Sequence, residues 1–557
     1  MKLTFSWRSA LCTLLLAAVM LLPSSLTAEG YVYKVKSGGT GDGSSWERAL
    51  GEKGLLEKLA TAGYGHEFWI AAGTYRPYIA PEPSDSNARA DDELDPREHA
   101  FVLNRGVALY GGFAGTETSR SQRDWERNTT VLSGYIELQG GSSTNSYTVV
   151  VVSDDMGLPA ILDGFSITGG KADGEETLGN GGGMRILDSY THVTNCTFSG
   201  NQATRGGGIY VSGGAPVFKD STFSGNTADL GGGIYNEESR LTVSDCAFSD
   251  NQARSGGAIL NNGRETDGAV HALQSATATI TKSTFSGNNT TESGGAISNW
   301  KSSPAITDSS FSANKSNVEG GAMFNSDSSP LLTSCTFASN TSENGGAISS
   351  WDSSPVIVNC TFYSNRASSN GGALLNDRSS SIVVNATFTR NRASTGGGMF
   401  NFQCSPVVAN SILWGNGTEV RSEGGAVTIS YSIIEGGFDG EKNLSVNPLL
   451  GALHDNGGPT ETCALDQKSP AIDAGLFVGS RVSGNVIVPP TDQRGTARPR
   501  GAGVDIGAYE YYDEDTPPAP GGGGGGGGCR ASSGSAGALL LLFPLVPFLL
   551  RRRRTAP

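Results

Sequence analysis

The chain has 557 residues, of which 79 are glycine and 17% are charged, with a formal net charge of −14. Glycine at this level without a Gly-x-y triplet excludes collagen. Without residues 1–28 and 529–557, the body of the chain holds 33 basic and 54 acidic residues. This balance argues against nucleic acid or an anionic bilayer as a partner for the body.

Residues 1–28 have the three parts of a secretory signal peptide. Lys2 and Arg8 form a basic start, residues 11–22 are an apolar run, and Leu-Thr-Ala at 26–28, ending at Ala28, fits a cleavage site. The run is too short for a comfortable membrane span. The sequence therefore predicts an exported protein located at the cell surface, in the outer membrane or outside the cell.

Residues 29–150 are expected to form an N-terminal cap and the first coils of a longer array. Ser44 and Glu47 have the spacing of a capping box, and residues 46–60 carry apolar side chains at near-helical spacing. We expect an amphipathic helix here that seals the N-terminal end of the array.

Residues 151–435 contain a repeat of 25 or 26 residues. Each copy starts with a glycine pair, at Gly181, Gly206, Gly231, Gly256, Gly294, Gly320, Gly345, Gly371 and Gly396. An aromatic-x-x-Asn element follows in the same phase, with Phe198, Phe223, Phe248, Phe285, Phe311, Phe337, Phe362 and Phe388 each three residues before an Asn. A ninth copy has Leu413 and Asn416 in these places, and one interval holds an insert at residues 263–274, expected to be a surface loop.

Each copy reads as short strands separated by turns, and one copy is too small to form a core alone. Stacked copies would bury one continuous column, with Phe above Phe and Asn above Asn. A second row, Asn236, Asn261, Asn299, Asn325, Asn376 and Asn401, repeats in the same phase. We expect the Asn side chains to bond from coil to coil and to tolerate left-handed turns, with sharp corners at the glycine pairs.

These repeats resemble the polymorphic outer-membrane protein repeat, with Gly-Gly-Ala-Ile at 256–259, 294–297 and 345–348. Asp-Gly-Ser-Ser-Trp at 42–46, Ala-Ala-Gly-Thr-Tyr at 71–75 and Tyr-Gly-Gly-Phe at 110–113 resemble the start of bacterial β-helix surface proteins. The resemblance implies an all-β fold: a pectin-lyase-like, right-handed, single-stranded parallel β-helix with an N-terminal capping helix.

The repeat fades in residues 436–512. Asp-Gln-Arg-Gly at 492–495 and Asp-Ile-Gly-Ala-Tyr-Glu at 505–510 resemble the choice-of-anchor Q region, which precedes anchoring tails. Residues 513–528 form a Pro/Gly linker, and residues 529–557 combine Cys529, an apolar stretch and four arginines. This layout resembles C-terminal sorting signals of the GlyGly and Synergist types, which implies surface attachment through a processed C-terminus. A plain short membrane anchor is the alternative.

Four cysteines, Cys196, Cys246, Cys335 and Cys360, lie two residues before the repeat Phe and should point into the core. Cys335 and Cys360 fall on adjacent coils and could form a disulfide, but we favour free buried thiols. The five histidines are scattered without a nucleophile at motif spacing, and no Cys-x-x-Cys is present. We therefore expect no cofactor and no zinc site.

One polar stripe is the candidate site. The position two residues after the second Asn row reads Glu238, Gly263, Lys301, Asp327, Asp352, Arg378 and Gln403 along the stack. Asp327 and Asp352 would be neighbours, able to bind Ca²⁺ or to act on a sugar as catalytic carboxylates. A solvated, charge-balanced surface fits the same pattern and is favoured.

Trp300, Trp351 and Phe402 precede this stripe by one position. Aromatic rings beside acidic groups suit a sugar-binding platform, and packing under a loop is the alternative. The favoured function is a non-catalytic display or adhesion scaffold at the cell surface. A carbohydrate-binding surface protein, or a polysaccharide lyase or glycosidase, remains the alternative, with a glycan or a ligand on a host or neighbouring cell as partner.

Overall fold

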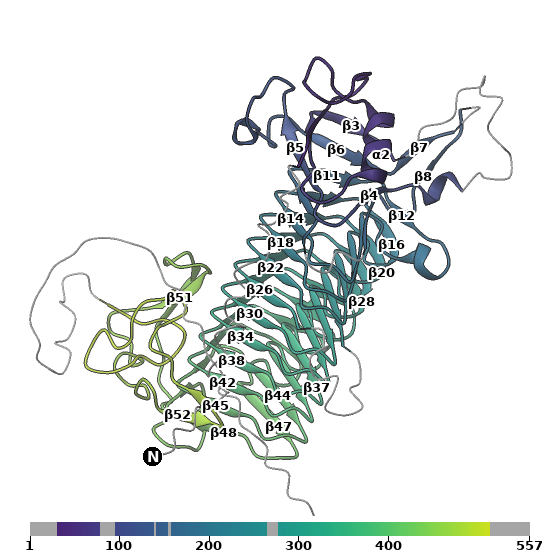
Figure 1. Ribbon diagram of the computed structural model, residues 1–557. Helices are drawn as coiled ribbons and strands as arrows, with labels where there is room; N and C mark the ends of the chain where they lie inside the picture. The colour runs from purple at the N-terminus through teal and green to yellow at the C-terminus, as the bar shows by residue number, and fades with distance from the viewer. Residues whose placement is uncertain (1–29, 78–94, 139–140, 154–157, 264–276, 513–557) are drawn as a thin grey trace, which may run out of the picture. The chain divides into compact units, whose positions relative to one another are not determined.

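The computed structural model describes residues 30–77, 95–138, 141–153, 158–263 and 277–512. The expected signal peptide, most of the 263–274 insert, the linker and the expected sorting signal, with Ala28 and Cys529, lie outside these residues. Each repeat forms one coil of three or four short strands, which pair in parallel with the same strands of the next coil (Figure 1). Four long parallel sheets result, named sheets 1 to 4 in the order in which the chain visits them.

Sheet 1 contains β1 (Val32–Val35), β2 (Glu67–Ala71), β5 (Ala108–Phe113), β10 (Ile161–Asp163), β14 (His192–Thr194), β18 (Val217–Lys219), β22 (Thr242–Ser244), β26 (Thr279–Thr281), β30 (Ala305–Thr307), β34 (Leu331–Thr333), β38 (Val356–Val358), β42 (Ile382–Val384), β45 (Val407–Ala409) and β48 (Thr428–Ser430). Sheet 2 contains β3 (Gly73–Tyr75), β6 (Thr130–Ser133), β11 (Ser166–Thr168), β15 (Thr197–Ser199), β19 (Thr222–Ser224), β23 (Ala247–Ser249), β27 (Thr284–Ser286), β31 (Ser310–Ser312), β35 (Thr336–Ala338), β39 (Thr361–Tyr363), β43 (Thr387–Thr389), β46 (Ile412–Trp414) and β49 (Ile433–Ile434).

Sheet 3 contains β12 (Lys171–Ala172), β16 (Gln202–Arg205), β20 (Thr227–Leu230), β24 (Gln252–Ser255), β28 (Asn289–Ser293), β32 (Lys315–Ser316), β36 (Thr341–Ser342) and β40 (Arg366–Ala367). Sheet 4 contains β4 (Phe101–Leu103), β9 (Val150–Ser153), β13 (Met184–Leu187), β17 (Ile209–Ser212), β21 (Ile234–Glu237), β25 (Ile259–Asn262), β29 (Ile297–Trp300), β33 (Met323–Ser326), β37 (Ile348–Trp351), β41 (Leu374–Asp377), β44 (Met399–Phe402) and β47 (Val420–Glu423).

Short elements accompany the sheets. The helices are α2 (Glu52–Thr61) and the 3-10 turns η2 (Pro96–Glu98), η3 (Arg120–Gln122) and η4 (Glu176–Gly179). Antiparallel hairpins pair β7 (Tyr135–Glu137) with β8 (Ser143–Asn145), β50 (Leu450–His454) with β51 (Thr462–Leu465), and β52 (Arg481–Ser483) with β53 (Val486–Ile487). The all-β parallel β-helix predicted from the repeats is therefore confirmed.

The repeat phenylalanines form a continuous stack inside the helix. From Phe198 to Phe388 successive ring centroids are 4.5–5.1 Å apart with planes within 6° of parallel. These rings are fully buried, and Leu413 continues the row beyond Phe388. Stacked rings bury large apolar areas in register, so this row fixes the alignment of neighbouring coils.

The asparagines of the Phe-x-x-Asn element form a buried ladder that links each coil to both neighbours. The Asn314 Nδ2 group donates to Asn340 Oδ1 at 3.0 Å and to the Phe285 carbonyl at 2.9 Å. Its Oδ1 accepts from the backbone and side-chain N–H groups of Asn288. The ladder ends at Asn416, whose backbone and side-chain N–H groups both donate to the Glu419 carboxylate. Burial raises the pKa of Glu419 to about 7.

The expectation that these asparagines occupy the left-handed turn conformation is wrong. The positive φ falls on the residue just before each Asn, for example Gly200, Asp250 and Ala313. The Asn backbone stays outside the left-handed region because its side chain must point inward to continue the ladder. The glycine corners behave as expected: Gly206 has φ of 67°, and a Cβ there would lie 2.2 Å from the Ile209 carbonyl oxygen.

The cysteines of the repeat are buried and free, in agreement with the favoured interpretation. The Cys335 backbone N–H points at the Cys360 sulfur at 3.4 Å, without a disulfide between the two. In other coils a serine hydroxyl fills the same place, as where Ser283 N–H donates to Ser309 Oγ. Thiol and hydroxyl therefore serve as interchangeable small acceptors in one ladder.

The N-terminal helix exists, but its predicted bounds and cap are wrong. Helix α2 runs from Glu52 to Thr61, after Gly51, and Leu55 and Leu59 join the buried core column. Residues 46–51 are held outside the helix because the Trp46 indole packs near Phe113 and donates to the Glu117 carbonyl at 2.8 Å. Ser44 bonds to Asp42 instead of capping the helix.

The C-terminal region folds back against the β-helix at the corner between sheets 1 and 2. Gln493 Nε2 donates to Thr336 Oγ1 at 2.8 Å, and its Oε1 accepts from Thr361 Oγ1 at 2.7 Å. Asn410 Nδ2 donates to the Asp505 carbonyl, and the Gly507 N–H donates to the Asn410 carbonyl. Residues more than 90 positions apart in the chain are joined by these bonds.

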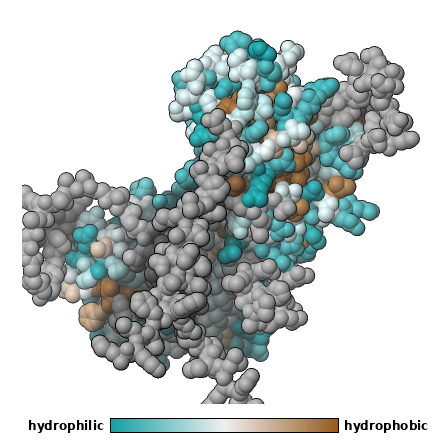
Figure 2. Space-filling model, viewed as in Figure 1, coloured by the Kyte–Doolittle hydropathy of each residue, from teal (hydrophilic) through white to brown (hydrophobic). Residues whose placement is uncertain are grey.

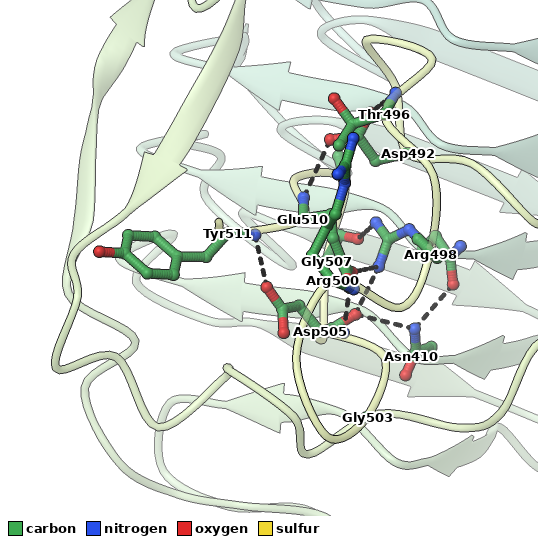
Figure 3. Close-up of polar contacts among 12 residues, drawn as sticks. Asn410, Asp492, Thr496, Arg498, Arg500, Gly503, Asp505, Gly507, Glu510 and Tyr511 are labelled. Carbon is green, nitrogen blue, oxygen red and sulfur yellow. Dashed lines mark hydrogen bonds and ion pairs between the residues drawn. The ribbon is translucent and has the colours of Figure 1, made fainter. Parts of the chain in front are cut away.

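A buried ionic network holds this region together (Figure 3). Arg498, with no exposed side-chain surface, donates to Glu510 Oε2 at 3.0 Å and to the carbonyls of Asp505 and Gly507. Glu510 also accepts from the backbone N–H groups of Arg500 and Asp505. The Glu510 backbone N–H also donates to Asp492 Oδ2 at 3.0 Å, so segments 492–495 and 505–510 both belong to this network.

Candidate functional site

The outer face of sheet 4 carries two rows of outward side chains. The first row is buried even though it points away from the core: Tyr210, Tyr235, Leu260, Ser298, Phe324, Ser349, Leu375 and Phe400. Leu230 of sheet 3 and Leu187 of the second row pack against the first-row cluster of Tyr210, Tyr235 and Leu260. Tyr210 also hydrogen-bonds Glu237, and Asn262 donates to the Tyr235 hydroxyl at 3.0 Å.

Trp300 and Trp351, two of the three aromatic candidates for a sugar-binding platform, belong to the second row and are exposed. Register places Trp300 beside Ser326 and Ser326 beside Trp351, so the two indoles are two coils, or about 9.6 Å, apart. Their exposed fractions are 42% and 37%. Phe402 lies in the same row but is only partly exposed.

Both indoles are fixed by contacts with the first row. Trp300 Nε1 donates to Ser298 Oγ at 2.8 Å, and the Trp351 ring meets the Phe324 ring edge-on with centroids 5.7 Å apart. A ring held in one orientation before a ligand arrives costs less conformational entropy on binding. The first row therefore holds both exposed indoles in fixed orientations.

The charged stripe follows immediately after the sheet 4 strands. Lys301, Asp327, Asp352 and Arg378 all have φ near 50°, which turns the chain sharply at this position. Arg378 binds Asp352 with two bonds of 2.8 Å and Asp377 with one of 2.7 Å. The Arg378 hydrogen bond lowers the pKa of Asp352, so this exposed carboxyl group is ionised and paired.

Asp327 and Asp352 occupy one row as expected, on adjacent coils. Paired with Arg378, Asp352 is poorly placed to give a proton to a glycosidic oxygen or to bind a cation. In the described ranges, no group of three or more His, Cys, Asp or Glu side chains is placed to hold a metal ion. The arrangement suits a charge-balanced surface beside the two indoles.

Glu319 is a site residue that the sequence did not single out. It lies directly before a glycine pair, where sheet 3 meets sheet 4, and it is 8% exposed. Ser349 Oγ donates to it at 2.6 Å and Asn344 Nδ2 at 3.1 Å. Burial, with a contribution from nearby Glu343 and Asp377, raises the pKa of Glu319 to about 7. A lone carboxylate before a glycine pair was the available signal, since other coils have Leu230, Ser255 or Asn370 there.

The raised pKa of Glu319 predicts a pH-dependent stability. The folded chain holds this proton more tightly than the unfolded chain, so the free energy of unfolding falls as the pH rises from about 5 to about 7. We expect Glu319→Gln, which keeps a hydrogen-bonding partner for Ser349 and Asn344, to unfold a few degrees above wild type at pH 8 and near wild type at pH 5. Thermal unfolding at both pH values measures this, and equal midpoints at pH 8 would contradict the assignment.

In Figure 2 the described surface on the viewed side is mainly hydrophilic or neutral, and hydrophobic residues form only small groups. No helix among the described residues has the length and apolar character needed to cross a membrane.

Comparison with known proteins identifies the fold family. A family model described as the right-handed β-helix region matches residues 145–353 and 258–433, which together span more than half of the chain. The chain belongs to the right-handed β-helix family. No curated protein matches this β-helix protein.

Solved structures with a similar fold have diverse functions. Pectate lyase Pel9A is 12% identical, with 86% of this chain and 96% of that chain covered and a TM-score of 0.35. PfbA, a surface adhesin of Streptococcus pneumoniae, is 13% identical, with 74% and 90% covered and a TM-score of 0.33. The family 28 exopolygalacturonase of Yersinia enterocolitica is 11% identical, with 75% and 78% covered and a TM-score of 0.32. Similarity at this level concerns the fold and does not select among these activities.

Proposed function

We propose that this β-helix protein is an exported, non-catalytic display or adhesion scaffold that binds a glycan along the outer face of sheet 4. The observation that carries the proposal is the pair of fixed, half-exposed indoles of Trp300 and Trp351, two coils apart in register. Indole faces stack on pyranose rings, and a repeating strand array presents them at a regular spacing along an extended chain.

The charged groups beside the indoles support binding without cleavage. Asp352 is ionised and held by Arg378, and Asp377 shares the same guanidinium group. A glycosidase needs one carboxyl group that gives a proton and a second that acts on the opposite side of the bond. The exposed Asp352–Arg378 pair provides polar contacts for sugar hydroxyls instead.

Surface location is the second part of the proposal and rests on the sequence. Residues 1–28 have the pattern of a secretory signal, and residues 529–557 have that of a processed sorting signal. Mass spectrometry of the protein recovered from its native cells would test this. Loss of Arg551, Arg552, Arg553 and Arg554 from the mature chain is expected, and an intact C-terminus would contradict processing.

The glycan proposal predicts a selective loss of binding. We expect Trp351→Ala to weaken binding to the recognised glycan about tenfold or more, because the stacking surface is removed. A glycan array with the purified full chain measures this. Leu331→Ala, which removes a similarly exposed apolar side chain from sheet 1, is the matched control and should bind as wild type does. Equal binding by Trp351→Ala and wild type would overturn the proposal.

Hydrolysis of a glycan is the second candidate function, and Glu319 is the observation that favours it. A carboxyl group with a pKa of about 7 is protonated enough at neutral pH to act as a general acid. Its position beside Ser349, two residues before Trp351, would bring it near a bound sugar. Glu319→Gln would abolish turnover in that case.

A further inference from the structure

A separate pocket lies at the N-terminal end of the β-helix, on the corner between sheets 1 and 2. Its volume is about 340 Å³. One wall is the segment that contains Trp125 and Glu126. The other wall is formed by three consecutive coils, which contribute residues 164–166, residues 195–197, and Asp220 with Thr222. The lining residues fall between positions 125 and 222, whereas Trp300 and Trp351 lie later in the chain and on sheet 4.

Two glycines allow the Trp125 segment to lie against this corner. A Cβ on Gly112 would lie 2.7 Å from the Trp125 Cα, and one on Gly164 would lie 3.1–3.2 Å from Arg123 and Trp125 side-chain atoms. Both glycines have φ between 85° and 90°, which other residues rarely adopt. The two glycines therefore let the Trp125 segment pack closely against the neighbouring coils.

Arg123 links the Trp125 segment to the neighbouring coils. Its guanidinium group bonds Asp163 in a mostly buried ion pair at 2.5 Å and donates to the Gly111 and Asp163 carbonyls. The same group lies 4.9 Å from the Trp125 ring centroid. This cation–π contact holds the indole, which remains 38% exposed at the pocket.

The opposite wall presents a row of hydroxyl groups. Ser166, Thr197 and Thr222 pair in register on three successive strands of sheet 2, all three partly exposed. All three residues line the pocket. Glu126 and Asp220 add carboxylates at the exposed rim, with Asp220 3.3 Å from Lys219 Nζ. An indole face opposite several hydroxyl and carboxylate groups is the chemistry that recognises a sugar.

We propose that this pocket binds a single pyranose that carries no carboxylate. The volume is sufficient for one sugar ring, and the two rim carboxylates disfavour an anionic one. Cys196, which also lines the pocket, is buried, and burial raises the pKa of its thiol to about 12, so the thiol stays protonated. This site is additional to the sheet 4 face and does not depend on it.

The test uses the full chain and a panel of methyl glycosides of glucose, galactose, mannose and N-acetylglucosamine, with glucuronic acid for comparison. Calorimetric titration should detect binding of at least one methyl glycoside and markedly weaker binding of glucuronic acid. Trp125→Ala should weaken that binding about tenfold or more, and Thr197→Val about fivefold through loss of one hydroxyl group.

Two further results complete the test. Trp351→Ala should bind the methyl glycoside as wild type does, which separates this pocket from the sheet 4 face. Circular dichroism should show both pocket variants folded, and Thr197→Val, which keeps the side-chain shape, serves if Trp125→Ala does not fold. Binding of no methyl glycoside, unchanged binding by folded Trp125→Ala and Thr197→Val, or equal binding of glucuronic acid would overturn the proposal.

Discussion

Asn314→Ala is expected to lower the free energy of unfolding by about 3 kcal/mol or more, because it leaves several buried polar groups of neighbouring coils without partners. The substitution removes the acceptor of the Asn288 backbone and side-chain N–H groups and one donor to the Phe285 carbonyl. The Asn340 Oδ1 also loses one of its two donors. Chemical denaturation followed by circular dichroism measures the change.

Lys315→Ala is the matched control for this ladder. Lys315 is the next residue, exposed on the short strand β32, and its side chain makes no described ion pair. Its replacement should change the free energy of unfolding by less than about 0.5 kcal/mol. A similar small loss for Asn314→Ala would show that the Asn ladder does not hold the coils together.

Arg498→Met is expected to release the C-terminal region from the β-helix. The substitution leaves Glu510 buried without its cationic partner, and breaking a buried ion pair in this way costs about 3–5 kcal/mol. Cys463, buried in β51 of this region, should then react with a maleimide. Cys335 and Cys360, inside the stacked coils, should remain unreactive.

The control for this prediction is Arg421→Ala, which breaks the exposed ion pair with Glu423 at 3.3 Å. An exposed pair contributes little, so the labelling pattern should match that of wild type. Mass spectrometry after labelling identifies the reactive cysteine. Protection of Cys463 in Arg498→Met would mean that the ionic network is dispensable for docking.

The repeating part of the fold could be predicted because the same residue type recurs at the same position of each repeat and makes the same contact in each coil. The Phe stack, the Asn ladder and the burial of Cys335 and Cys360 all follow from the phase of one repeat. Features that occur once gave no periodic signal. Glu419, which ends the ladder, and Glu319, which lies between sheets 3 and 4, are examples.

Contacts between distant segments were the other features beyond prediction. The start of helix α2 is set by the Trp46 indole, whose partner Glu117 is 71 residues away. Gln493 donates to Thr336, 157 residues away in the chain. The Asp-Gln-Arg-Gly motif was recognised in the sequence, but its partner was not. For the site, the alignment of Trp300 with Trp351 was predictable from the repeat, whereas the Asp352–Arg378 pairing depends on side-chain conformation.

Binding of a glycan to sheet 4 without cleavage is tested most directly by one measurement. The full chain is incubated with the polysaccharide that it binds most tightly, and the chain length of that polysaccharide is followed by size-exclusion chromatography. Unchanged chain length, with retention of the polysaccharide on wild type and its loss on Trp351→Ala, is the predicted result. Progressive shortening by wild type that Glu319→Gln or Asp352→Ala abolishes would contradict it.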